Sequence, residues 1–104
     1  MDFELEHRDG RLRASGDMNI YSANAMKQRL LTCMESDGGG DVQLDLSEVA
    51  EIDTCGLQIL LLAERMAAAR GRSLRIVDAS AAAREVLTLC GLDRLRADAS
   101  KRAA

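Results

Sequence analysis

The stretch DVQLDLSEVAEIDTCGLQILLLAERMAAAR, residues 41–70, decides the fold. Its first part alternates apolar and polar residues from Val42 to Leu46, and a period of two is typical of a β-strand. A polar loop is expected next, and Asp53 or Thr54 then supplies the oxygen that caps a long apolar helix. We therefore expect a strand, a tight loop and a helix in that order.

The segments on either side of this stretch add further strands and helices. Phe3 and Leu5 alternate with glutamates, and Leu12 and Ala14 alternate with arginines, so a β-hairpin is expected whose second strand ends at Gly16. The remaining expected elements are a helix capped by Ser22, a strand over residues 74–77, and a helix that Ser80 caps and Gly91 ends, with Ala83, Val86, Leu87 and Cys90 on its inner face.

The resulting element order, ββαβαβα, predicts an α/β fold, in which a mixed β-sheet of about four strands has its helices packed mainly on one face. A chain of 104 residues fits one domain, which we expect to span residues 1–97, with a frayed tail over residues 98–104. The long helix is apolar nearly all round, so it is either sandwiched inside the domain or exposes an apolar stripe to a partner.

The composition narrows the possible classes of function. A net charge of −3 argues against binding to a phosphate backbone, and an aromatic content of 2% leaves little for base stacking, so no nucleic acid partner is expected. The longest apolar run is too short for direct membrane insertion. The N-terminal residues are charged and the three cysteines lack metal-site spacing, so we expect a cytoplasmic protein with reduced thiols.

No catalytic set is visible in the sequence. The only histidine, His7, lies in the expected hairpin, whereas a general base needs a partner and a pocket. The sheet could bring Asp17, Asp45 and Asp53 together, but their spacing does not define the paired carboxylates of a hydrolase. No His and Cys cluster has the spacing of a metal site. We therefore expect no enzymatic activity and no cofactor.

The turn Asp53–Gly56 is the place where a specific interaction is expected. In one interpretation Asp53 or Thr54 caps the helix and Cys55 packs beneath it. In another, the turn is a contact or modification site, where a phosphate on Thr54 would add about −1.5 to −2 charges at the helix start. A third hypothesis is a thiol sensor at Cys55, because a helix start stabilises a thiolate and favours its selective oxidation.

Motifs spread over nearly the whole chain resemble those of the STAS domains, the sulphate-transporter and anti-sigma-factor-antagonist family. They are GDMNI at residues 16–20, LDLSEV at residues 44–49, IDTCGL at residues 52–57 and the final GL at residues 91–92. The Asp-Leu-Ser segment followed by Asp-x-x-Gly-Leu is the specific part. The resemblance implies the STAS fold, a small sheet domain that acts by binding.

In the sigma-regulating members that the chain resembles, the free domain captures an anti-sigma factor kinase and so releases a sigma factor. The kinase phosphorylates a serine, less often a threonine, just before the glycine of the turn, and this abolishes binding. Here Cys55 occupies that position and is no ordinary kinase acceptor, so Thr54 is the phosphorylation candidate. The family often has Asp in the loop before the first helix, where this chain has Asn19.

Two further branches carry a similar Asp-Thr-x-Gly-Leu turn. One comprises single-domain STAS proteins of bacterial chemotaxis and two-component pathways, and the other is the STAS subunit of the ABC transporter that maintains outer-membrane lipid asymmetry. We therefore expect a bacterial regulator that docks an anti-sigma factor, a serine kinase or a chemotaxis-type signalling protein. The alternative is a transporter subunit that contacts its ATPase through Thr54. The expected partner-binding residues are Asp17, Asn19, Tyr21, Asp53, Thr54, Cys55, Gly56 and Leu57.

Overall fold

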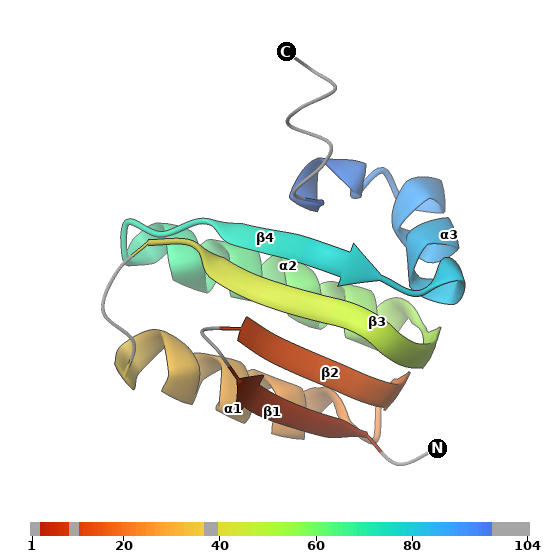
Figure 1. Cartoon of the computed structure of the whole chain (residues 1–104), viewed down its shortest axis with the longest axis horizontal. Coiled ribbons are helices and arrows are strands. Elements are labelled where there is room, and N and C mark those ends of the chain that lie inside the picture. The colour runs from red at the N-terminus through yellow and green to blue at the C-terminus, as the bar shows by residue number, and fades with distance from the viewer. Residues whose placement is uncertain (1–2, 9–10, 37–39, 97–104) are drawn as a thin grey trace.

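Figure 1 shows the computed structural model of the chain, which describes residues 3–8, 11–36 and 40–96. The tail expected over residues 98–104 lies outside the described residues. The predicted element order is confirmed, with one 3₁₀ turn added after the last helix. The elements are β1 (Glu4–Arg8), β2 (Arg11–Met18), α1 (Ala23–Ser36), β3 (Val42–Ile52), α2 (Thr54–Ala69), β4 (Leu74–Ala79), α3 (Ala81–Leu89) and the 3₁₀ helix η1 (Asp93–Leu95).

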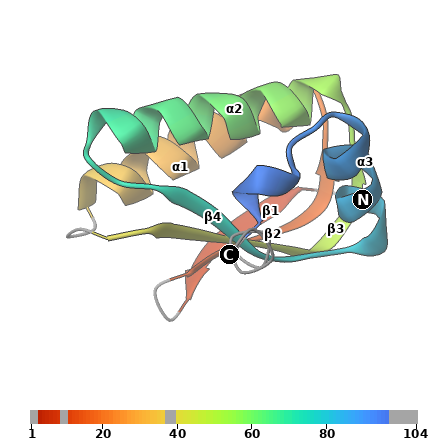
Figure 2. The same ribbon diagram turned by 90° about the horizontal axis from the view of Figure 1, so that it is seen from above.

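The strands form one mixed four-stranded sheet in the order β1-β2-β3-β4. β1 runs antiparallel to β2, whereas β2, β3 and β4 run parallel to one another. Helices α1 and α2 lie side by side on one face of the sheet (Figure 2), and α3 follows beyond the end of β4 (Figure 1). The predicted α/β fold, with helices mainly on one face of a mixed sheet, is therefore confirmed.

The core lies between this sheet face and the two long helices. Every second residue of β2 and of the first half of β3 faces the helices, and these apolar side chains are buried. On α2, residues three or four positions apart form the buried stripe, namely Leu57, Leu60, Ala63 and Ala67. The other large apolar residues of α2 are half-buried, so this helix is neither fully sandwiched nor wholly open; they are Ile59, Leu61, Leu62 and Met66.

Strands β2 and β3 are longer than the sequence pattern predicts. The prediction that β2 ends at Gly16 is wrong, because the strand continues to Met18, and the loop expected after Leu46 is strand up to Ile52. The β2–β3 register shifts at two places, and such irregularities change which face the next side chain takes. Gly16, whose φ of 88° suits glycine, lies at one of these shifts. The apolar alternation therefore breaks although the strands continue.

Helix α3 buries a narrower face than the sequence predicts. Ala83 and Leu87 are fully buried, and Val86 is half-buried. Cys90, expected on the same inner face, is exposed because α3 ends at Leu89 and Cys90 is its C-cap. The fully buried stripe of α3 therefore consists of two residues, and Val86 packs against the core beside it.

Polar groups occupy both edges of the sheet and one helix end. At the β1 edge, the Arg29 guanidinium donates to the Leu5 carbonyl oxygen at 2.6 Å. At the β4 edge, Ile76 forms an isolated parallel bridge with Arg96. Buried Arg72 donates from Nε to the Gly40 carbonyl at 2.8 Å and from Nη1 to the Met34 carbonyl at 3.2 Å. Arg72 thus fastens the end of α1 and the start of β3 to the α2–β4 turn.

Candidate functional site

The turn between β3 and α2 is fixed by the side chain of Asp53. Its Oδ1 accepts hydrogen bonds from the backbone N–H groups of Cys55 at 2.9 Å and Gly56 at 3.2 Å, which makes Asp53 the N-cap of α2. These bonds satisfy two of the N–H groups that a helix start leaves without intrahelical partners. Of the two capping candidates, Asp53 is therefore the cap, and Thr54 stands exposed as the first residue of the helix.

Gly56 and Leu57 are buried and position the turn from inside. A Cβ atom on Gly56 would lie 2.7 Å from the Met18 carbonyl oxygen and 2.9 Å from the Met18 Cβ. The Asp53 N–H donates to the same Met18 carbonyl oxygen at 3.1 Å. Because glycine has no side chain, the first turn of α2 lies directly against the end of β2. The glycine of the Asp-x-x-Gly motif thus has a packing role.

The loop between β2 and α1 is held by Asn19 and Ser22. The Asn19 Oδ1 accepts from the N–H groups of Tyr21 at 2.9 Å and Ser22 at 3.3 Å. The Ser22 hydroxyl accepts from the Asn19 N–H and donates to the Asp17 carbonyl, both at 2.9 Å. Ser22 precedes α1 as predicted, but its hydroxyl binds within the loop instead of capping the helix, a competition common for serine at helix starts.

The turn and the loop come together because the Asp53 N–H is bonded to Met18, the residue before the loop. Of the remaining predicted partner-binding residues, Asp17, Asn19 and Cys55 are half-buried. Tyr21 is 93% exposed, so nearly all of its ring is available for contact. The exposed surface of this site therefore comes mainly from Tyr21, Asp53 and Thr54.

Two exposed apolar residues near the site are not among the predicted partner-binding residues. Ile20 is 66% exposed beside Tyr21, and Leu89 is 78% exposed at the end of α3. Leu89 lines a groove together with Asn19 and Asp53. The sequence position of Leu89 could have indicated its exposure. Leu89 follows Val86 by three positions and falls outside the inner stripe of α3.

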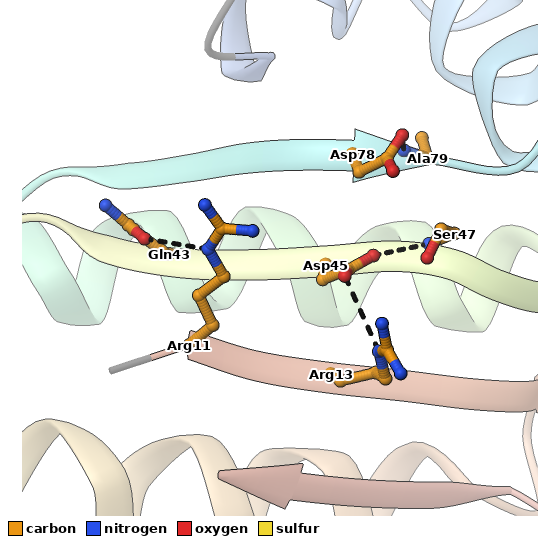
Figure 3. Close-up of polar contacts among 7 residues, drawn as sticks. All are labelled: Arg11, Arg13, Gln43, Asp45, Ser47, Asp78 and Ala79. Atoms are coloured by element: carbon orange, nitrogen blue, oxygen red, sulfur yellow. Dashed lines mark hydrogen bonds and ion pairs between the residues drawn. The ribbon is translucent and has the colours of Figure 1, made fainter. Parts of the chain in front are cut away.

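Asp45 lies apart from Asp17 and Asp53, so the sheet does not gather the acidic group that the sequence allowed. It stands on the open sheet face, where its Oδ2 is 3.5 Å from the Arg13 Nε and its Oδ1 accepts the Ser47 N–H at 2.8 Å (Figure 3). Burial raises the pKa of Asp45, but the Ser47 hydrogen bonds and the Arg13 charge outweigh burial and leave this pKa below its ordinary value of 3.8.

The lowered pKa of Asp45 makes a prediction about acid stability. A carboxylate whose pKa is lowered by folding stabilises the folded state above its unfolded pKa, here 3.8, and this contribution disappears as the pH falls through the lower folded pKa. Asp45→Asn is expected to lower the free energy of unfolding by about 1 kcal/mol near neutral pH, because a charged acceptor is replaced by a neutral one.

Urea denaturation of both proteins at neutral pH and well below pH 3.8 checks this expectation. The difference between the wild type and Asp45→Asn should shrink at the acidic pH. A difference that stays constant with pH would show that the Asp45 charge contributes nothing to stability.

The other candidate groups are dispersed over the described residues. The cysteines Cys33 and Cys55 are half-buried and Cys90 is exposed, each outside a disulfide, while His7 is exposed on β1. No group of three or more His, Cys, Asp or Glu residues in the described ranges could hold a metal ion. The helices of this part of the chain are each too short or too polar to cross a membrane.

The fold and the turn define a small α/β domain with a capped, exposed helix start beside a hydrogen-bonded loop. A family model described as "Mlab, STAS domain" matches residues 1–97, and the chain belongs to this STAS domain family. Among curated proteins, the chain is similar to the anti-sigma-B factor antagonist of Bacillus subtilis (strain 168). The two are 24% identical over 92 residues, which span 88% of this chain and 83% of the relative.

Solved structures share the fold. An anti-sigma factor antagonist from Mycobacterium paratuberculosis has a TM-score of 0.70 and 22% identity, over 92% of this chain and 82% of that chain. The anti-sigma factor antagonist SpoIIAA in its unphosphorylated form has a TM-score of 0.72 and 17% identity, over 91% of this chain and 85% of that chain. The resemblance to the STAS family and the predicted STAS fold are therefore confirmed.

Proposed function

We propose that the chain is a non-enzymatic regulatory domain that docks a protein partner through the Asp53–Gly56 turn and the β2–α1 loop. The observation that supports this most is the exposed Thr54 on a turn that is capped by Asp53 and bonded to Met18. A surface that is already held in place loses little conformational freedom on binding. Tyr21, exposed next to it, is of a residue type that dominates many interfaces.

The proposed partner is an anti-sigma factor or serine kinase, or a chemotaxis-type signalling protein, in the bacterial cytoplasm. The anti-sigma factor antagonists among the similar proteins support the first of these. In such a pathway the domain regulates transcription by freeing a sigma factor. Thr54 is the proposed phosphorylation site, because Cys55 stands directly before Gly56 and carries no hydroxyl. A phosphate there would place about −1.5 to −2 charges next to Asp53.

A second candidate function is a STAS subunit of a lipid-asymmetry ABC transporter. The name Mlab in the description of the matching family model favours it. In this role Thr54 contacts the transporter ATPase and needs no modification. The same exposed turn serves both functions, so the identity of the captured partner separates them.

Thr54→Glu is expected to weaken partner binding roughly tenfold or more, because a carboxylate without a matching cation must be desolvated at the centre of the contact. An acidic residue in the first turn of a helix is favoured by the helix dipole, so the variant should remain folded. The measurement is affinity capture from the native host with tagged wild-type and variant proteins, read by mass spectrometry that includes phosphosites.

Thr32→Glu on α1 is the matched control, because Thr32 is also an exposed helical threonine but lies in the half of α1 remote from the turn. A kinase-like ATPase or signalling protein that is lost only with Thr54→Glu supports the regulatory function. A transporter ATPase with its permease, and no phosphate on Thr54, supports the transporter function. Equal capture by wild type and Thr54→Glu would remove the turn from the interface.

A further inference from the structure

A groove of about 480 Å³ runs between the end of β3 and α3, directly beside the Asp53–Gly56 turn. Residues of α3 that recur every three or four positions form one wall of it, which is the spacing of a single helix face. This face is distinct from the one that Ala83 and Leu87 bury in the core. The apolar lining residues are Met18, Ala50 and Ile52 from the strands and Ala82, Val86 and Leu89 from α3.

The apolar residues that α3 contributes to the groove are only partly covered. Leu89 is 78% exposed, and Val86 and Ala82 are half-buried. Large exposed apolar residues are few on this molecule, since only Ile20 and Tyr21 accompany Leu89 among the described residues. All three lie on or next to the proposed docking surface, which indicates a larger contact area than the turn alone.

Exposed carboxylates lie beside these apolar lining residues. Glu51, Asp53 and Glu85 line the groove, and no Lys or Arg is among the described residues that line it. A second cavity that Asn19 also lines has Glu4 and Asp17 in its lining. An apolar floor with an acidic rim favours a partner segment that is apolar on one side and carries basic residues at its borders.

We propose that the groove binds an amphipathic helix of the partner. The apolar side chains of this helix contact Val86 and Leu89, and its lysine or arginine side chains pair with Glu51 and Glu85. This inference rests on the proposed docking function and specifies a second contact for it. Asn19 and Asp53 belong both to the groove lining and to the loop and turn. One partner can therefore cover the turn with one segment and fill the groove with the next, as in helix-in-groove recognition.

A synthetic amphipathic helical peptide, with leucines three and four positions apart and arginines beside them, is the direct probe. The measurement is an NMR titration of the wild-type domain, followed at the backbone amides of residues 50–53 and 82–89. The arginine peptide should shift these amides, and its dissociation constant should rise with ionic strength. A peptide with glutamates in place of the arginines should bind at least roughly tenfold more weakly.

Variants of the domain localise the contact. The Glu51→Lys, Glu85→Lys double variant is expected to bind the arginine peptide roughly tenfold more weakly than the wild type does. Leu89→Ser should weaken the binding of both peptides. The domain should remain folded, because Leu89 is mostly exposed. Arg84→Glu is the matched control, since Arg84 is exposed on α3 but does not line the groove. Shifts confined to other residues, or equal binding of both peptides, would overturn the proposal.

The captured partner separates this proposal from the proposed function. In one outcome Thr54→Glu alone weakens partner binding, while the Glu51→Lys, Glu85→Lys double variant and Leu89→Ser bind as wild type does. The groove is then excluded as a contact, and the turn is retained as the docking surface. If the groove variants weaken partner binding and Thr54→Glu does not, the docking surface is the groove and the turn is excluded. Loss in both sets of variants supports the two-segment contact.

Discussion

Replacing Arg72 by alanine is expected to lower the free energy of unfolding by about 2–4 kcal/mol. Arg72 is only 8% exposed, and its guanidinium donates to the backbone carbonyls of Met34 and Gly40. Removing it leaves these acceptors without their donor in a site that water reaches poorly, and an unpaired buried acceptor costs more than an ordinary hydrogen bond contributes. Because α1, β3 and the α2–β4 turn meet at Arg72, the loss should affect the whole cooperative unit.

Urea denaturation followed by circular dichroism measures this effect. Arg72→Lys should fall between wild type and alanine, because an ammonium group cannot reproduce both directions of the guanidinium fork. Arg75→Ala is the matched control: this half-exposed arginine lies 3.9 Å from the Asp41 carboxylate, and such surface pairs contribute less than about 1 kcal/mol. Equal losses for Arg72→Ala and Arg75→Ala would show that the carbonyl contacts of Arg72 are unimportant.

Gly56→Ala is expected to lower the free energy of unfolding by about 1–3 kcal/mol. Two effects compete at this position. Alanine inside a helix is favoured over glycine by about 1 kcal/mol, which alone would raise stability. However, the new Cβ would lie 2.7 Å from the Met18 carbonyl oxygen, a backbone atom that cannot rotate away. The start of α2 must therefore move off β2, and the clash should exceed the gain in helix propensity.

The sign of the change tests the packing role of Gly56 directly. Thermal and urea denaturation of Gly56→Ala and of Gln58→Ala should be compared, because Gln58 is exposed on the same helix and its replacement should change stability by less than about 0.5 kcal/mol. Partner affinity should also fall in Gly56→Ala, since the Asp53 N–H bond to Met18 belongs to the same contact. A more stable Gly56→Ala protein would contradict the close approach of α2 to β2.

The parts of the fold that local pattern determines were predictable from the sequence. The apolar stripe of α2 and the alternation at the start of β3 follow from helical and strand periodicity, and the order of elements followed from them. The extension of β3 beyond Leu46 could not be predicted, because register shifts against β2 move the next buried residue out of alternation. The exposure of Cys90 depends on where α3 ends, and element ends are set by local hydrogen bonds that periodicity does not encode.

For the candidate site, the sequence indicates candidate residues but not the surface that they form. Sequence pattern placed a capping oxygen at Asp53 or Thr54, and only the side-chain geometry shows that Asp53 caps and Thr54 remains outside. The β2–α1 loop is joined to the turn by the hydrogen bond from the Asp53 N–H to the Met18 carbonyl oxygen, a backbone contact that sequence pattern does not reveal. The groove could not be inferred, because it depends on how α3 packs against the end of β3.

The two occupied sheet edges have a consequence for how this domain can assemble. A bare edge strand offers its N–H and C=O groups to any extended chain, which permits strand addition and promotes aggregation. Here the Arg29 guanidinium already binds the Leu5 carbonyl on β1, and Arg96 is bridged to Ile76 on β4. An incoming strand would have to displace these contacts. We therefore expect partners to recognise this domain through its side chains, which can discriminate among partners, and not through backbone pairing at a sheet edge.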